Sequence, residues 1–532
     1  MEGTESRTRQ VNAAPRCGLG PGDRQPPLSC TSVGPSRQQK RTDASSKPVD
    51  LSSLYRQSSP TTTLLAPRNL HVLIPASRAD VDFCKTLLSA AVLGYPAPVI
   101  INWNKTFDDP KLTAGGSHLA KIAGLSEYLS GIDAAHDEDL MLLMDGFDVW
   151  IQLRPQTLID RYFAINRIAD ERIQRELGAA AEQHGIRQEI IFGCQKRCWP
   201  WKVDDPPCYA VPNSTLPVDV YGSQTDQPAD DEVSPYVNYR QRFLNSGGGM
   251  GTVRAMRKLF AQALKQAEYE ANFGSDQYIL SHIFGDQELW REAVRRTSNA
   301  SDGDVELHRH FDPHHLDEVQ KKAAEREDGT FEFGIGVDYG SEIVLNTVFV
   351  EDETAWHTFN NVSELMDAQA EHGITSPQGE QRDLSDDIAR ATPPFSTSPS
   401  IEELPRSLGW NDVPLLMDIW TGIAPAVIHH NAHRDGMKSR RKTWWSLVWF
   451  QGHARVLLDA SINSPEVPVA VSGYDATSQR QWWPYVSWQG SARAGQVGDG
   501  SAEIRFDETC RNHHEELFRD GKGPWQMPPP AH

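Results

Sequence analysis

The feature that most constrains the fold is an uninterrupted apolar run, Leu-Met-Leu-Leu-Met, between Asp139 and Asp145. A strand with one face in water alternates apolar and polar residues, whereas a run without alternation is typical of a strand covered on both faces. Other short apolar runs predict further strands, at 69–75, 98–103, 188–192 and 425–429. Helical spacing separates the early strands, at 80–93, 117–129 and after Pro155. This alternation predicts an α/β fold with helices on both faces of a sheet.

Composition divides the 532 residues into three parts. Residues 1–66 are rich in Ser, Thr, Pro, Gln and Arg and lack apolar periodicity, which predicts a disordered segment. Residues 67–440 contain the predicted strands and helices, and within them 365–408 is polar and rich in Pro and Ser, which is typical of a mobile insertion. Residues 441–532 are rich in Trp, and we expect them to form an extension packed on the preceding domain.

The net charge of −20 argues against a broad basic surface for nucleic acid. An acidic protein that handles an anionic substrate needs local cations, and a bound divalent metal can supply them. The chain has no stretch close to the roughly eighteen consecutive apolar residues of a membrane span. Its N-terminal region also lacks the apolar core of a secretory signal. We therefore expect neither a nucleic-acid partner nor a membrane span in this sequence.

Two other features are typical of the secretory route. Four Asn-X-Ser/Thr sequons occur, at Asn104, Asn213, Asn299 and Asn361. Cys194, Cys198 and Cys208 are clustered in a Pro-rich stretch, which favours a disulfide in an oxidising compartment. The alternatives are sequons that arise by chance and cysteines that are free or bind a metal, although three cysteines without a fourth ligand make a weak zinc site.

The strongest chemical signal is the segment Met144-Asp-Gly-Phe-Asp-Val-Trp150. On a straight strand, carboxylates three residues apart point to opposite faces, so Asp145 and Asp148 converge only if the strand ends at Asp145 and the chain turns. Gly146 permits such a turn. The pair would then lie at the carboxyl end of a buried strand, where its hard oxygens suit Mg²⁺ or Mn²⁺ beside a diphosphate. The alternative is a solvated turn without a metal.

Three further segments place polar groups at strand or helix ends. Val427-Ile-His-His-Asn431 is an apolar strand with a polar end, and His429 beside two carboxylates would favour Mn²⁺ over Mg²⁺. Phe243-Leu-Asn-Ser-Gly-Gly-Gly-Met-Gly251 runs into a helix, where glycines permit close approach to an anion. Gly274-Ser-Asp-Gln277 begins a helix, and Asp276 could face a sugar. The ordinary alternatives are a structural histidine, a packing turn, and a serine that caps a helix.

In this order along the chain, these four segments resemble the glycosyltransferase domain of the procollagen lysyl hydroxylases and, more loosely, the family 25 glycosyltransferases. The resemblance is closer to a group of uncharacterised fungal proteins that carry this domain, and it spans residues 67–530. The closer resemblance rests on Asp148-Val-Trp-Ile-Gln-Leu-Arg-Pro155, Lys196-Arg-Cys198, Gly285-Asp-Gln-Glu-Leu-Trp290, Trp482-Trp483 and Gly521-Lys-Gly-Pro-Trp525.

The resemblance implies a GT-A-like fold, which is a Rossmann-like mixed sheet with helices on both faces. It implies transfer of a sugar from a UDP-sugar donor to a hydroxyl of a protein or glycan. Mn²⁺, or another divalent metal, would be held by Asp145, Asp148 and His429 against the donor diphosphate. The remaining implied residues are the catalytic pair Asp276 and Asn245 and the donor contacts Lys121, Ser246, Gly247 and Asn431.

One position departs from the family pattern, because Ala432 stands where the late motif usually has glycine. This departure puts the approach of the backbone to phosphate in doubt. The alternative function is therefore a catalytically decayed domain that binds glycan or a partner through tryptophans such as Trp482, although tryptophans are more often core residues. A weaker alternative is a metal-dependent nucleotide-sugar hydrolase. The resemblance and the sequons together predict the lumen of the ER or Golgi.

Overall fold

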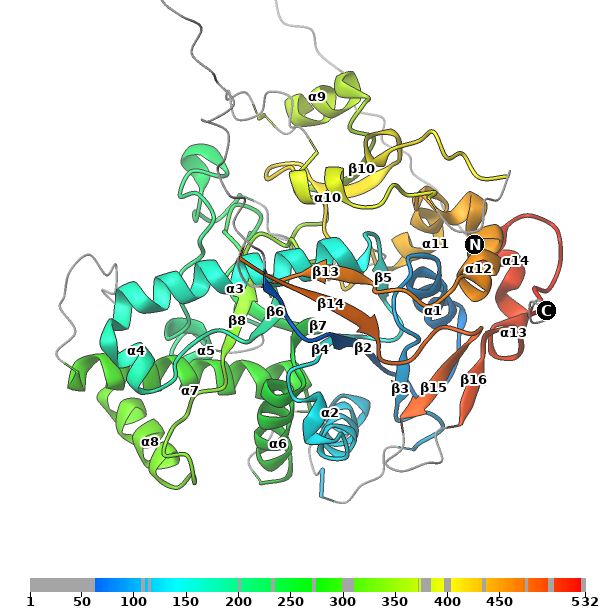
Figure 1. The fold of residues 1–532 in the computed structure, drawn as a ribbon. Coiled ribbons are helices and arrows are strands. Elements are labelled where there is room, and N and C mark those ends of the chain that lie inside the picture. Colours follow the sequence, from blue (N-terminus) through cyan, green and yellow to red (C-terminus); the bar gives the residue numbers. More distant parts are fainter. Residues whose placement is uncertain are drawn as a thin grey trace, which may run out of the picture. The chain divides into compact units, whose positions relative to one another are not determined.

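The apolar run before Asp145 forms strand β4, Leu140–Met144, and every residue of β4 is buried in the computed structural model. Alternate side chains of β4 enter two different hydrophobic clusters. One cluster contains α1, Val81–Val92, and the other contains α2, Gly116–Ser130, and α6, Val253–Tyr269. Figure 1 shows α1 on one side of the strands and α2 and α6 on the other. The prediction of a strand covered on both faces is confirmed.

The structure describes residues 63–527, which all belong to one compact unit. The segments left out within this range are 107–110, 113–115, 200–201, 231–234, 270–273, 299–310, 372, 375–383, 397–402, 433–436, 474–476 and 496–501. Residues 1–62 of the segment 1–66, which was predicted to be disordered, lie outside the described residues, and so does the sequon at Asn299. Thr63 and Leu64 form a strand, so the prediction of disorder is wrong at these two residues. Strand pairing begins at β1, Thr63–Leu64, which pairs with β14, Ser478–Pro484.

A large mixed sheet forms the centre of the fold, in the order β16-β15-β3-β2-β4-β7-β6-β9-β12-β5. Strands β2, β3 and β4 are parallel, and β7 runs antiparallel between β4 and β6. The remaining strands of this path are β2 Arg68–Pro75, β3 Val99–Ile101, β5 Val149–Ile151, β6 Ile190–Gln195, β7 Phe243–Thr252, β9 Val344–Asn346, β12 Val427–His429, β15 Ser491–Gly495 and β16 Glu503–Arg505. Beside this path, β8 Ile335–Asp338 pairs with β6, and β13 Ala470–Ser472 pairs with β14.

Local sequence signals explain where the main helices begin. Asp80 caps α1 and Ser275 caps α7, in each case by accepting a hydrogen bond from a backbone N–H of the first turn, while Pro155 begins α3. The remaining helices are α3 Pro155–Leu177, α4 Ala179–Gln183, α5 Pro206–Tyr209, α7 Asp276–Thr297, α8 Pro313–Ala324, α9 Val362–Glu371, α10 Asp386–Arg390, α11 Arg440–Trp444, α12 Ala454–Asn463, α13 Phe506–Thr509 and α14 His514–Phe518. No helix in the described part of the chain is long and apolar enough to cross a membrane.

The Trp-rich C-terminal residues are part of the central sheet rather than an added layer. β14 pairs with β2 and β15 pairs with β3, both in parallel. Trp445 and Trp482 are almost completely buried, so these two tryptophans are core residues and not stacking surfaces for sugars. A disulfide between Cys84 in α1 and Cys510 joins this part to the N-terminal strands and helices.

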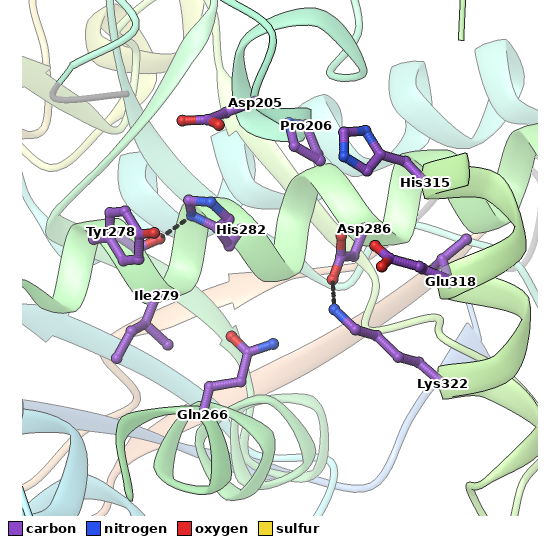
Figure 2. A pocket seen from close by; sticks show the side chains of 11 residues that line it. Asp205, Pro206, Gln266, Tyr278, Ile279, His282, Asp286, His315, Glu318 and Lys322 are labelled. Carbon is purple, nitrogen blue, oxygen red and sulfur yellow. Dashed lines mark hydrogen bonds and ion pairs between the residues drawn. The ribbon is translucent and has the colours of Figure 1, made fainter. Parts of the chain in front are cut away.

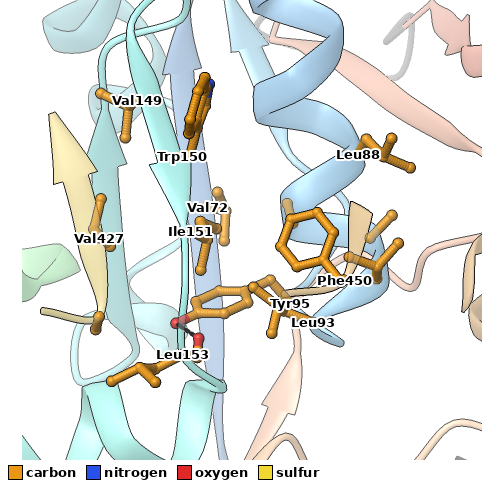
Figure 3. Close-up of a cluster of buried hydrophobic side chains, with 14 of the residues drawn as sticks. Val72, Leu88, Leu93, Tyr95, Val149, Trp150, Ile151, Leu153, Val427 and Phe450 are labelled. Carbon is orange, nitrogen blue, oxygen red and sulfur yellow. Dashed lines mark hydrogen bonds between the residues drawn. The ribbon is translucent and has the colours of Figure 1, made fainter. Parts of the chain in front are cut away.

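The core beside the carboxyl end of β4 is built from segments far apart in the sequence. Figure 3 shows Trp150 and Ile151 of β5, Val427 of β12 and Leu88 of α1 around one cluster. Within it, Tyr95 donates a hydrogen bond to a carbonyl oxygen after β5. This packing holds β5, which directly follows Asp148, and β12, which ends at His429.

Two more segments complete the described fold. β10, Thr354–His357, and β11, Leu415–Asp418, form a separate antiparallel pair. In the segment 365–408, the described residues include α10, and Ile388 and Phe395 are buried in the same cluster as α1. Cys198 and Cys208 form a disulfide, as the clustered cysteines predicted, and Cys194 is buried and free.

Candidate metal centre

Asp145 and Asp148 lie on either side of the tight turn between β4 and β5. Gly146 in this turn packs directly on the end of β2, because a Cβ added to it would lie 2.7 Å from the carbonyl oxygen of Pro75. On the other side, Arg441 donates a hydrogen bond to a carbonyl oxygen within the turn. β4 therefore ends at Met144 and the chain turns from Asp145, which is the condition under which the two carboxylates were expected to converge.

His429 comes to this turn through the pairing of β12 with β5. The two strands are antiparallel, and His429 stands opposite Val149, the residue after Asp148. Its Nε2 atom lies 3.5 Å from Asp148 Oδ1 and 3.9 Å from Asp145 Oδ2. One ligand atom from each of the three residues lies within 4.8 Å of the others, which is close enough to hold one metal ion.

The imidazole of His429 is held in the orientation that a metal ligand needs. Asn346, at the end of β9, donates its amide N–H to the carbonyl oxygen of Cys194, which leaves its amide oxygen 2.8 Å from His429 Nδ1. Because an amide oxygen can only accept, Nδ1 carries the hydrogen. Nε2 is therefore the atom that faces the carboxylates and can take a metal, and Asn346 is its orienting partner.

The Asn-Ser-Gly segment lies inside β7 and not in a turn, and it supports His429 instead of presenting its side chains to the site. β7 bulges after Asn245, and a Cβ added to Gly247 would lie 2.0 Å from His429 Cε1, so only glycine leaves room for the ring. The amide of Asn245 accepts from Gly247 N–H and donates to Gln195. Asn245, which the resemblance implies as a catalytic residue, is buried with both ends of its amide engaged by the protein, an arrangement that suits a positioning role.

Lys121 lies between Asp145, one of the three candidate metal ligands, and Asp276. Its ammonium lies 2.7 Å from Asp145 Oδ1, 2.8 Å from Asp276 Oδ2 and 3.0 Å from the carbonyl oxygen of Ser246. Burial alone would lower the pKa of Lys121, but Asp145 and Asp276 outweigh burial and raise it. Lys121 is thus a buried permanent cation between two carboxylates. Ser246 contributes through its backbone.

Asp276 is the first residue of α7 and also faces His118 on α2. The His118 Nδ1 atom lies 3.6 Å from Asp276 Oδ1, and the His118 side chain is 69% exposed. Burial opposes ionisation of Asp276, but Lys121 and His118 hold its pKa well below the ordinary value. The contact with Asp276 raises the pKa of His118. Asp276 therefore stays a carboxylate at neutral pH, while the imidazole of His118 beside it is open to solvent.

The pKa values of the two candidate metal ligands Asp145 and Asp148 are shifted in opposite directions. Burial raises the pKa of Asp145, with Lys121 opposing. For Asp148, burial is outweighed by His429 and by the cations Arg441 and Lys438, which bring its pKa to about 2. Lys438 is exposed, and its charge together with that of Arg441 favours the ionised form of Asp148.

Two motif residues, Asn431 and Ala432, lie just after β12. The side-chain oxygen of Asn431 accepts a hydrogen bond from the backbone N–H of Val348, so Asn431 fastens the end of β12 to the loop after β9. Ala432 is buried and is not among the residues with positive φ. Glycine is therefore not required at this position by the backbone conformation.

A second group of possible metal ligands lies at the other end of β4. Asp139, before β4, contacts His71 Nε2 at 3.1 Å and His136 Nδ1 at 2.7 Å, and its other contacts come from Asn69. These hydrogen bonds tie β2 to the start of β4 and satisfy the buried carboxylate without a metal. His71 stacks on Tyr485 at a ring separation of 3.8 Å.

A scan against protein-family models matched no family, and a search of curated proteins found no match. Sequence reasoning missed Asn346 and His118. Asn346 follows a short apolar stretch, so the strand-end rule that selected Asp145 and His429 could have found it. No sequence signal distinguishes His118 from an ordinary exposed helix residue.

Proposed function

We propose that this chain is a metal-dependent glycosyltransferase with a GT-A-like domain, which moves a sugar from a UDP-sugar to a hydroxyl of a protein or glycan. The observation that carries the proposal is the convergence of Asp145, Asp148 and His429 at strand ends, with His429 oriented by Asn346. The resemblance of the same segments to the glycosyltransferase domain of procollagen lysyl hydroxylases supports it.

Mn²⁺ bound by Asp145, Asp148 and His429 would supply a Lewis acid for the departing diphosphate. The charge of Lys438, which helps to lower the pKa of Asp148, would add to the attraction of the site for an anionic donor. Lys121 favours the ionised forms of Asp145 and Asp276 and holds both carboxylates in place. The ionised Asp276 carboxylate then stabilises positive charge that develops at the anomeric carbon.

In the proposed transfer, the acceptor oxygen forms a bond to the anomeric carbon as the bond from that carbon to the UDP oxygen breaks. The electron pair of the broken bond leaves with the diphosphate. The acceptor proton goes to Nε2 of His118, whose Nδ1 faces Asp276. Asp276 itself is a poor proton acceptor because its pKa is held low.

The metal assignment is tested by UDP release across UDP-sugars with Mn²⁺ and an acceptor panel. We expect Asp148→Ala and His429→Ala to lose both Mn²⁺ binding in calorimetry and UDP release. His314→Ala changes an exposed histidine on α8 and serves as the matched control. Unchanged activity in both site variants would refute the metal assignment. Mn²⁺ binding without turnover of any UDP-sugar would favour a decayed, glycan-binding domain. Acceptor-independent release of free sugar would indicate a hydrolase.

The role of His118 is tested by the pH dependence of kcat/KM. A base must be neutral to accept a proton, so kcat/KM should rise as the pH passes upward through the raised pKa of His118. Asp276, Lys121 and Asp145 are the charged groups that set this pKa. In His118→Gln this rising limb should disappear, while Mn²⁺ affinity stays within about twofold. An unchanged pH profile would assign the proton to another group.

We also propose that the protein works in an oxidising lumen of the secretory route. Two disulfides are formed among the described residues, and the sequon asparagines Asn104, Asn213 and Asn361 are exposed. Digestion of the protein made in a eukaryotic host with an N-glycosidase tests this proposal. We expect the mass to fall, and an unchanged mass would count against passage through the lumen.

A further inference from the structure

A cavity of about 480 Å³, the α3 cavity, lies between the C-terminal end of α1, the N-terminal end of α3 and the segment that joins α12 to β13. This volume is within the common range of ligand pockets, about 300–1,000 Å³. None of the residues at the candidate metal centre lines this cavity. A ligand in it would therefore occupy a site separate from the metal and from the proposed transfer.

Most of the wall of the α3 cavity is apolar. Val467, in the loop before β13, is 58% exposed, and Val471 in β13 is also exposed. The other apolar side chains of the wall include Leu457, Ile462, Pro465, Pro468, Val469 and Pro484. Covering such a wall removes apolar surface from water, which favours a ligand with an apolar body.

Arg154 is the one cationic side chain on the described part of this wall. Its guanidinium donates through Nε and Nη2 to the carbonyl oxygens of Thr392, Pro393 and Pro394. Among the residues that the structure describes, Nη1 has no hydrogen-bond partner and no carboxylate pairs with Arg154. Burial lowers the pKa of Arg154 to about 10, whereas a carboxylate close by would raise it. Arg154 is thus a cation at neutral pH whose charge no described carboxylate balances.

The end of the cavity at Arg154 is positive for a second reason. Pro155 and Gln156 are the first residues of α3 and line the cavity, and the N-cap residue Arg154 makes no capping hydrogen bond with its side chain. The N-terminal end of this helix of 23 residues favours an anion. The one carboxylate on the described part of the wall is Glu466, which already accepts a hydrogen bond from Ser487. Arg154 and α3 together therefore favour an anionic group from outside the protein.

A smaller cavity, between α7 and α8, shows a cation that the protein does balance. Its volume is about 270 Å³, and Figure 2 shows Lys322 directed at Asp286 on its wall. The Lys322 ammonium lies 2.7 Å from the Asp286 carboxylate, so the two charges compensate each other. The absence of such a carboxylate beside Arg154, among the described residues, distinguishes the α3 cavity.

We propose that the α3 cavity binds a monocarboxylic acid with an apolar chain, of the fatty-acid class. The carboxylate would accept hydrogen bonds from Nη1 of Arg154 at the N-terminal end of α3, and the chain would cover the apolar wall. Trp488 also lines the cavity, and its indole N–H is buried without a partner among the described residues. The wall thus has a second donor, which again favours a ligand that supplies acceptors. The proposal does not rest on the transferase activity.

Other ligand classes fit this wall less well. A phosphate dianion would leave one negative charge unbalanced beside a single guanidinium, and burying an unpaired charge is costly. A peptide would bring backbone N–H groups against an apolar wall, where each of them needs an acceptor. A neutral lipid would leave the Arg154 cation without a counter-charge.

The test is isothermal titration calorimetry on the full chain in EDTA, with decanoate, decan-1-ol, decyl phosphate and decyltrimethylammonium as ligands below their micelle-forming concentrations. These ligands share one chain and differ in the head group. We expect decanoate to bind at one site and decyl phosphate to bind more weakly. Decan-1-ol and decyltrimethylammonium should bind at least about tenfold more weakly, because the charge-assisted hydrogen bond to Arg154 is lost. No binding of decanoate would overturn the proposal, and so would equal or tighter binding of any other ligand of the set.

Two variants of the wall, each with a matched control, locate the decanoate in the α3 cavity. Arg154→Met should weaken decanoate binding at least about tenfold, whereas Arg167→Met, an exposed change on the same helix, should leave it unchanged. Val467→Asp changes an exposed position of the wall, so we expect it to fold normally and to weaken decanoate binding several-fold by adding a negative charge. Its control is Val203→Asp, at an exposed position outside the cavity. Wild-type affinity in either variant of the wall would overturn the proposal.

Discussion

Replacing Lys121 with methionine tests the charge balance of the site most directly. Its ammonium is 2.7 Å from Asp145 and 2.8 Å from Asp276. At an effective dielectric constant of about 20, each pair has a gross attraction of roughly 6 kcal/mol, most of which offsets the cost of burying the charges. Removing one partner of a buried ion pair usually costs about 3–5 kcal/mol. We expect the free energy of unfolding in EDTA to fall by about this amount.

Mn²⁺ should reverse part of the loss. The ammonium of Lys121 repels a cation bound to Asp145, so Lys121→Met should bind Mn²⁺ at least about tenfold more tightly, which adds about 1.4 kcal/mol of stabilisation at the same high Mn²⁺ concentration. Urea unfolding with EDTA and with Mn²⁺ measures both effects. Lys105→Met removes an exposed pair with Glu127 and should change stability by less than about 1 kcal/mol. Equal losses in the two variants, or no extra gain with Mn²⁺, would refute this account of Lys121.

Three further predictions concern the support of the site. Asn346→Leu removes the acceptor that orients His429 and should weaken Mn²⁺ binding about 10–100-fold in calorimetry; unchanged affinity would show that the ring is held otherwise. Gly247→Ala places a methyl where the His429 ring lies, and we expect a loss of at least about tenfold in the same titration, with native-like circular dichroism. Cys84→Ala with Cys510→Ala removes a link across 426 residues and should lower the free energy of unfolding by about 2–5 kcal/mol without changing Mn²⁺ affinity; equal stability under reducing and oxidising conditions would contradict this.

Asp145 and His429 could be predicted as candidate metal ligands because both follow the same rule. A buried strand in an α/β sheet displays its last residues at the edge where ligands bind, and Asp145 and His429 both follow continuous apolar runs. The pairing of β12 with β5 then brings His429 beside Asp148. The rule identifies which residues reach the edge, but the pairing comes from sheet order, which periodicity does not reveal.

The C-terminal residues show where such reasoning fails. β14 is rich in Trp and polar residues and lacks a long apolar run, yet it pairs with β2 from more than 400 positions away. The disulfide between Cys84 and Cys510 was equally out of reach, because cysteine spacing reveals only local candidates such as Cys198 and Cys208. Contacts between residues so far apart in the sequence depend on the tertiary arrangement. The hydrophobic periodicity of the two segments does not reveal them.

Asp276 and Lys121 were predicted as residues of the candidate site, but their separate roles were not. Asp276 was predicted as a catalytic, sugar-facing carboxylate, and its ion pair with Lys121 limits the roles that are open to it. A carboxylate held ionised by a buried ammonium can stabilise positive charge, but for the same reason it binds a proton weakly. The proton must then go to a more exposed group, and His118 lies 3.6 Å away on the solvent side. In the proposed transfer, the buried lysine, rather than either carboxylate, would therefore determine which group performs which step.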